Sequence, residues 1–230
     1  MATVTVNSLV AKAQVILQDV TKVRWPENEL IDWLNDGQRE VVLIRPQASV
    51  SNTTVALDSG KTKQSIPNDG VMLIDVVRNM GSAGATPGNA IRICSREVLD
   101  AQYPDWHSAT NTLGYVQHYM YDPRDPKSFW VYPLAPTPWH VQLVYSASPA
   151  AASAGGSISI DDIYSNALVD YMLYRAYSKD AEYAGNAQRA MGHYSAFQNS
   201  LGVKTKSELE QNPNLTTVGF NPNIPGQART

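Results

Sequence analysis

The sequence predicts an α+β protein in which helical segments at both ends of the chain enclose a β domain. Near the two ends, apolar residues recur every three or four positions, which places them on one face of a helix. Between the ends, apolar and polar residues alternate in short runs separated by turn residues. We expect N- and C-terminal helical hairpins to form a four-helix bundle (1–46 plus 158–202), with an inserted antiparallel β-sandwich or barrel-like domain (47–157) and an extended C-terminal tail (203–230).

The N-terminal hairpin is predicted from two apolar stripes. Asn7 or Ser8 can cap the first helix, because their side chains accept hydrogen bonds from free backbone N–H groups. The stripe of this helix contains Leu9, Val10, Ala13, Ile16, Leu17 and Val20. The second helix follows Trp25-Pro26 and ends before Pro46, and its stripe contains Leu30, Leu34, Gly37, Val41 and Ile44. A glycine on an apolar stripe indicates that a partner helix comes close at Gly37.

Six short segments of the middle region have the alternation of β-strands. They are residues 53–57, 71–77, 89–93, 114–121, 128–134 and 139–147. Turn sequences such as DSGK, PNDG and DPRDP separate them. A short helical turn at SREVLDAQ interrupts the series, and AASAGGS (151–157) has the composition of a flexible linker at the domain boundary.

Helical spacing returns in the last part of the chain. Asp161 or Asp162 is expected to start the third helix, and the fourth is expected to stop at Gly202. The third helix contains the tyrosine-rich stretch YMLYRAYSKDAEYA (171–184), which is apolar over more than half of its circumference. One face is needed for the bundle core, so the surplus face suggests contact with another subunit. The candidate subunit contacts are Tyr171, Tyr174, Tyr177 and Trp33.

Composition argues against several functional classes. The formal net charge is −3, from 18 basic and 21 acidic residues, so the chain lacks the positive charge with which proteins hold phosphate backbones. A single cysteine, Cys94, excludes an internal disulfide and a multi-cysteine metal site. The N-terminal residues do not match a signal peptide, and no apolar run approaches the roughly 20 residues that cross a bilayer. We expect no membrane partner.

Motifs of catalysis and cofactor binding fit the sequence poorly. The SGKT run at 59–62 lacks the first glycine of a phosphate-binding loop, where Val55 stands instead. The four histidines are too widely spaced for a zinc motif. Asp122 and Asp125 in DPRDP could bind a cation, but the prolines favour a hairpin end. We therefore expect no enzyme, no cofactor and no metal.

Three stretches resemble the head-to-tail adaptor (connector) proteins of short-tailed bacteriophages. RWPENELIDWLNDGQREVVLIRP (24–46) is similar to the second helix of that family, with its tryptophan, E-L and W-L-N. SFWVYPLAPTPWHVQLVYSASP (128–149) is similar to its aromatic–Tyr-Pro strand and following hairpin. ALVDYMLYRAYSKDAEYAGNAQRAMGHYSAF (167–197) resembles its third and fourth helices. The likeness covers most of residues 5–202 in the family's order.

This resemblance implies a structural virion protein. It implies a homo-oligomeric ring, a dodecamer, that is assembled in the host cytoplasm and sits at the head–tail interface between the portal protein and the tail nozzle protein. Genomic DNA would pass through the ring without sequence-specific binding and would be retained and later delivered. The C-terminal extension of such adaptors reaches the portal, so the portal-contacting residues are expected to be Leu215, Val218, Phe220 and Ile224.

The sequence leaves a different function open. The β domain contains Trp106, Trp130 and Trp139, and exposed aromatic rings can stack on sugars. The alternative is therefore a tail-associated carbohydrate- or receptor-binding module built on the β domain. Exposed, coplanar tryptophan rings would support this interpretation, whereas buried rings would indicate ordinary packing.

Overall fold

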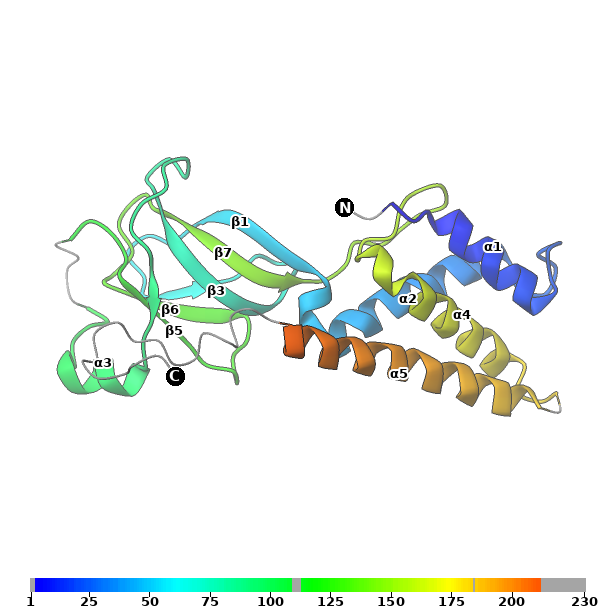
Figure 1. Ribbon diagram of the computed structural model, residues 1–230. Coiled ribbons are helices and arrows are strands. Elements are labelled where there is room, and N and C mark those ends of the chain that lie inside the picture. The colour runs from blue at the N-terminus through cyan, green and yellow to red at the C-terminus, as the bar shows by residue number, and fades with distance from the viewer. Residues whose placement is uncertain (1–2, 109–112, 184, 212–230) are drawn as a thin grey trace, which may run out of the picture.

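The protein consists of a helical part and a β part that lie side by side (Figure 1). A computed structural model describes residues 3–108, 113–183 and 185–211. Both ends of the described chain contribute to the helical part, which contains α1 (Val6–Leu17), α2 (Glu27–Ile44), α4 (Ser165–Lys179) and α5 (Asn186–Gln211). The short turns η1 (Pro46–Ala48) and η2 (Asp162–Tyr164) adjoin it, and two sheets with α3 (Arg96–Gln102) form the β part. The predicted α+β class is confirmed.

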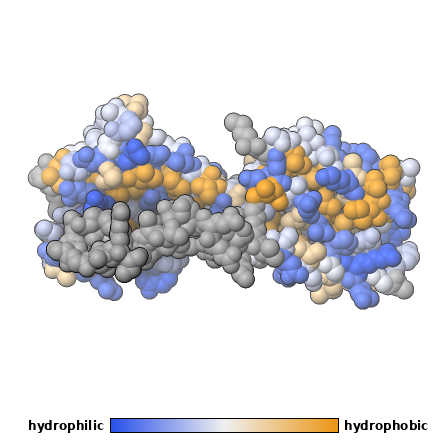
Figure 2. Space-filling model, in the orientation of Figure 1, coloured by the Kyte–Doolittle hydropathy of each residue, from blue (hydrophilic) through white to orange (hydrophobic). Residues whose placement is uncertain are grey.

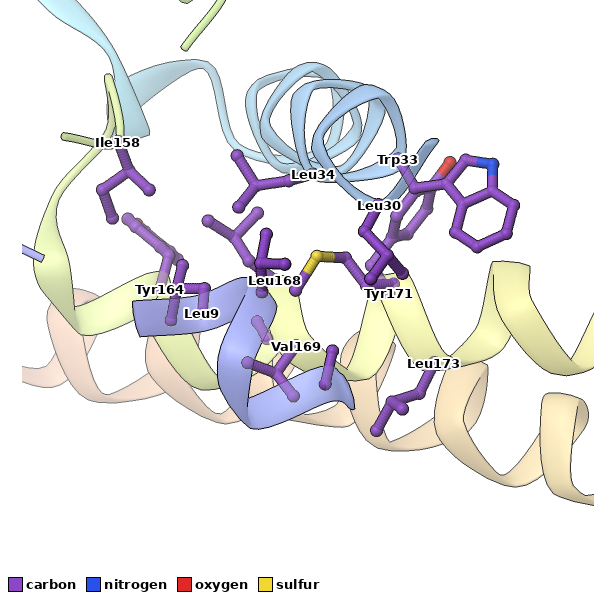
Figure 3. Close-up of a cluster of buried hydrophobic side chains, with 14 of the residues drawn as sticks. Leu9, Leu30, Trp33, Leu34, Ile158, Tyr164, Leu168, Val169, Tyr171 and Leu173 are labelled. Atoms are coloured by element: carbon purple, nitrogen blue, oxygen red, sulfur yellow. The ribbon is translucent and has the colours of Figure 1, made fainter. Parts of the chain in front are cut away.

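Helix α4 occupies the centre of the helical part, because it packs against α1, α2 and α5. Buried side chains from all four helices form one apolar cluster. Leu30 and Leu34 of α2 point toward Leu168 of α4, and Leu9 of α1 lies on another side of the same cluster (Figure 3). The N-terminal and C-terminal segments therefore share one core although the β part separates them in the sequence.

Helix α1 begins earlier than predicted, and its stripe is only partly buried. Its cap is Thr5, whose side chain accepts a hydrogen bond from the Ser8 backbone N–H, so Asn7 and Ser8 are not the caps that the sequence predicted. Leu9, Val10, Ala13 and Leu17 are buried, as expected. Ile16 is 47% exposed, and Val20, which lies beyond the helix end at Leu17, is 68% exposed.

Gly37 lies where α2 and α4 approach each other, as the sequence predicted. A Cβ atom at this position would lie 3.0 Å from Cδ1 of Tyr171 and 3.3 Å from Cδ2 of Leu168. Both neighbours are buried, and the Tyr171 ring also packs against Phe197 with ring centroids 5.3 Å apart. The absence of a side chain at Gly37 thus sets the distance between α2 and α4.

The β part contains a three-stranded and a four-stranded sheet. The strands of the first are β1 (Val50–Ala56), β3 (Gly70–Gly81) and β7 (His140–Ala147), in the order β1-β7-β3 with antiparallel neighbours. Those of the second are β2 (Lys63–Ser65), β4 (Arg92–Ile93), β5 (His118–Tyr121) and β6 (Ser128–Tyr132), in the order β2-β6-β5-β4. Strand β2 was not predicted, and the β4–β5 pair is parallel, so the pairing is not antiparallel throughout.

One apolar cluster joins the two sheets. Leu73, Val76 and Leu143 come from the first sheet, and Phe129 and Val131 from the second. Both Phe129 and Val131 alternate along β6 with residues of intermediate exposure, which is the period-two pattern that identified this strand in the sequence.

The segment 151–157 is fixed to the helical part and is not the flexible linker that its composition suggested. The Asn35 side chain donates a hydrogen bond from Nδ2 to the Ala152 carbonyl (3.0 Å) and accepts one at Oδ1 from the Ala152 N–H (2.8 Å). Gln38 donates from Nε2 to Asn35 Oδ1 and accepts at Oε1 from the Ser159 N–H. Thr5 and Ser157 form an antiparallel bridge. Asn35 and Gln38 are buried, so these bonds are shielded from water.

The fourth long helix does not stop at Gly202. Helix α5 continues through Gly202 to Gln211, so the segment after residue 202 begins as helix. Gly202 is exposed, and a Cβ atom there would meet no heavy atom within 4 Å. Glycine lowers helix propensity by about 1 kcal/mol relative to alanine, which is too little to end a helix that is packed along its preceding turns.

We expect Asn35→Ala to lower the free energy of unfolding by about 2–4 kcal/mol, because it leaves the buried N–H and C=O groups of Ala152 without partners. Urea unfolding followed by circular dichroism measures this change. Asn199→Ala, on the exposed side of α5, is the matched control and should change stability by less than about 0.5 kcal/mol. Equal effects of the two substitutions would contradict a special role for Asn35.

Gly37→Val should lower the free energy of unfolding by about 1–3 kcal/mol, because its side chain would overlap the buried rings and methyl groups of α4. The same substitution at Gly192, where a Cβ atom would have open space, should stay within about 0.5 kcal/mol of the wild type. Thermal or urea unfolding compares the two variants. A neutral Gly37→Val would show that the α2–α4 distance is not fixed by this glycine.

Candidate subunit interface

Two of the four residues predicted to contact another subunit lie inside the helical core. Tyr171 is 7% exposed and Trp33 is 8% exposed. Both are drawn in Figure 3, where Tyr171 lies beneath α2. Burial raises the pKa of the Tyr171 hydroxyl. These two residues pack within the chain, and their role in subunit contacts stays a prediction.

The other two predicted residues, Tyr174 and Tyr177, are half-buried against α5. The Tyr174 ring packs on Tyr194 with centroids 4.8 Å apart, and Tyr177 stacks on His193 at 5.7 Å and an interplanar angle of 10°. His193 Nδ1 lies 2.9 Å from an oxygen of Asp170 on α4. The tyrosine-rich stretch therefore supplies the aromatic layer that joins α4 to α5. A role of Tyr174 and Tyr177 in subunit contacts also stays a prediction.

A partly apolar groove lies between α1 and α4, and we call it the α1–α4 groove. Val15 is 66% exposed and Ile16 is 47% exposed along its α1 side. Figure 2 shows apolar surface over this region of the helical part. The residues that line the groove are Ser8, Ala11, Lys12, Val15, Ile16, Asn166, Val169 and Asp170. Contiguous exposed apolar surface of this kind marks sites of protein–protein contact.

The loop between α1 and α2 is held by one carboxylate. Asp19 accepts hydrogen bonds from the backbone N–H groups of Trp25 (2.9 Å), Arg24 (2.8 Å) and Val23 (3.1 Å). These bonds stabilise the charged carboxylate and so hold the pKa of Asp19 below its ordinary value. The bond from the Trp25 N–H has the largest effect. The loop thereby keeps a fixed shape beside the end of the α1–α4 groove.

The same loop is fastened to the turn between α4 and α5 by Arg24. Its guanidinium forms an ion pair with Asp180 and lies over the Tyr183 ring, 4.7 Å from the centroid. Hydrogen bonding to the Asp180 carboxylate and then to the Tyr183 side chain raises the pKa of Arg24, which is charged at every physiological pH in any case. Arg24 thus joins this loop to the end of α4 and to Tyr183.

The three tryptophans of the β part do not form a coplanar exposed row. Trp106 is completely buried and donates from Nε1 to Asp100. Trp139 is half-buried and donates from Nε1 to Asn79. The half-buried Trp130 ring lies near the cationic groups of Lys63 and Arg96. Their main contacts are within the β part, which gives no support to the carbohydrate-binding alternative.

Side chains that suggested metal binding are occupied by neighbouring residues. Asp122 accepts from the backbone and side chain of Arg124, and Asp125 accepts from Ser128 and Lys63, as expected for a hairpin end. Among residues 3–108, 113–183 and 185–211, no group of three or more His, Cys, Asp or Glu side chains could hold a metal ion. Within the same ranges, no helix is both long and apolar enough to span a membrane.

Comparison with known protein families decides the identity of the chain. Residues 4–218 match the family model described as SU10 adaptor protein. The chain belongs to the SU10 adaptor protein family. No curated protein matches it. The family is one of structural phage adaptors, in agreement with the head-to-tail adaptor resemblance of the sequence.

The structure shows what the W-L-N motif of the adaptor resemblance does in this chain. In W-L-N, Trp33 and Leu34 pack into the core while Asn35 binds Ala152, so the motif joins α2 to the chain that returns from the β part. As a phage adaptor, the protein is a virion component, and family membership implies the portal and tail proteins as partners and association with further copies. The predicted portal-contacting residues Leu215, Val218, Phe220 and Ile224 lie outside the described residues.

The stability of this SU10 adaptor should fall when the pH drops below about 4, partly through Asp19. The pKa of Asp19 is lower in the folded state than in the unfolded state. Asp19 therefore contributes fully to the free energy of unfolding above its unfolded-state pKa, and this contribution is lost as the pH falls through its folded-state pKa. Asp19→Asn should be less stable than the wild type at pH 7 and should lose less stability as the pH falls through that range. Urea unfolding at each pH tests this, with Asp105→Asn, an exposed carboxylate of the β part, as the control. Parallel pH profiles of wild type and Asp19→Asn would contradict it.

Proposed function

We propose that this adaptor forms a dodecameric ring between the portal and the tail nozzle of a short-tailed phage. Family membership over residues 4–218 is the observation that carries the proposal. The exposed apolar α1–α4 groove supports it, since the neighbouring exposed side chains of Val15 and Ile16 offer another subunit an apolar contact surface. The finer arrangement, with four helices as the ring-forming bundle and the β part as a sandwich-like extension toward the tail, belongs to the same proposal.

The ring would extend the DNA channel and help to retain and then deliver the genome. A ring of twelve copies has a formal charge of −36, at −3 per chain. An acidic wall repels phosphates, so DNA would pass without being held and without sequence-specific contact. The function needs no bond-making step, and the residues of the ring act by packing and by electrostatic repulsion.

The C-terminal residues would attach the ring to the portal. Residues 212–230 contain Leu215, Val218, Phe220 and Ile224, separated by polar residues and prolines. In the proposed contact, these four apolar side chains would be buried against the portal. Helix α5, which precedes this segment in the sequence, ends at Gln211 beside the β part (Figure 1).

Removal of residues 212–230 should abolish attachment to the portal protein of the same phage in a pull-down and leave the helical circular-dichroism signal in place. Replacement of the four apolar residues by serine in the full chain should have the same effect. Ile93→Ser, which changes an exposed apolar residue of β4, is the matched control and should retain attachment. Wild-type attachment by the truncated chain would contradict the portal-contacting role.

A further inference from the structure

The α1–α4 groove has a positive charge among its apolar residues. Lys12 is exposed on α1 between Ala11 and Val15, and α1 contains no acidic residue. The described part of the chain offers Lys12 no ion pair. Asp170, across the groove, is already engaged by His193. The groove therefore presents an apolar surface with one unpaired ammonium group.

The outer face of α2 has the opposite charge. Asp32, Asp36 and Glu40 follow one another at four-residue intervals, which places them on one side of the helix. Asp36 pairs with Arg39, whereas exposed Asp32 has no ion pair within residues 3–108, 113–183 and 185–211. Leu43 continues the same side and is 73% exposed. This α2 face is thus acidic with an apolar end, and it complements the groove in charge.

The groove and the α2 face lie on opposite sides of α4. Gly37 of α2 meets α4 at Leu168 and Tyr171, whereas the α4 residues that line the groove are Asn166, Val169 and Asp170. A helix turns by about 100° per residue, so these two sets point in different directions. Two different complementary faces on opposite sides of one chain allow copies to associate head to tail, and a head-to-tail contact can close into a ring.

We propose that the α1–α4 groove of one copy receives the α2 face of the next copy, with Lys12 of the first paired to Asp32 of the second. This inference rests on the proposed ring and names the surfaces that form it. Burial of Val15 and Ile16 supplies the apolar contact, and the Lys12–Asp32 pair fixes its register and excludes wrong pairings. A copy of this chain is the occupant because it brings both the matching charge and, at Leu43, exposed apolar surface.

Charge reversal tests the pairing. Lys12→Glu and Asp32→Lys should each shift the concentration at which oligomers form at least about tenfold upward, because like charges then face each other. The double variant Lys12→Glu/Asp32→Lys should recover wild-type assembly, since the carboxylate introduced in the groove of one copy would meet the ammonium group introduced on the α2 face of the next. An equimolar mixture of the two single variants should assemble better than either variant alone. Sedimentation velocity over a concentration series measures assembly, and circular dichroism verifies folding.

The control is Val15→Asp, which places a carboxylate in the apolar part of the groove. It should weaken assembly, because the introduced carboxylate would be buried in the apolar contact and would face the acidic α2 face of the next copy. Single charge variants that assemble like the wild type would overturn the proposal. Impaired single variants that the double variant does not restore would also overturn it, and would indicate a different partner for the groove.

The same experiment separates this inference from the proposed function, because it is done without the portal. A wild-type chain that stays monomeric at every concentration would overturn the pairing of copies. If that monomer attached to the portal protein, the proposed portal contact would still be supported. Conversely, a chain that assembles through these faces but fails to bind the portal would support the pairing and contradict the portal contact.

Discussion

The hydrogen bonds between Asn35 and Ala152 are the interaction on which the arrangement of the helical part depends. A chain that leaves the bundle for a β domain and returns must bring its backbone back against a buried helix surface. Buried N–H and C=O groups need partners, and a single asparagine side chain satisfies one of each. Gln38 extends the contact to Ser159, just before α4. The return point is thereby fixed to one short stretch of α2.

Once the returning chain is fixed, the packing around α4 determines which surfaces stay exposed. Gly37 brings α2 close, and the rings of Tyr174 and Tyr177 join α4 to α5. These contacts use most of the circumference of α4. The side of α4 that remains uncovered faces the α1–α4 groove, where Val15 and Ile16 of α1 are exposed to water. The internal packing and the surface available for assembly are consequences of the same geometry.

Periodicity predicted the elements well because it depends only on local burial. The long helices, most of the strands, the close approach at Gly37 and the adaptor resemblance all come from local patterns. Tertiary contacts decided the rest. The Gly- and Ala-rich segment 151–157 has a linker composition, but Asn35 binds it, and no local pattern reveals a partner so distant in the sequence. The exposure of Ile16 likewise depends on how the helices pack, and the three-residue strand β2 is too short for alternation to be recognised.

Native-state hydrogen exchange tests the central claim most directly. If the Asn35–Gln38 contacts fasten the returning chain, the amides of Ala152 and Ser159 should exchange only when the helical part unfolds, with protection equal to that of Leu34 in α2 and Leu168 in α4. Exchange of Ala152 and Ser159 as fast as that of an exposed loop, while α2 and α4 stay protected, would show that the segment opens independently and would contradict the account.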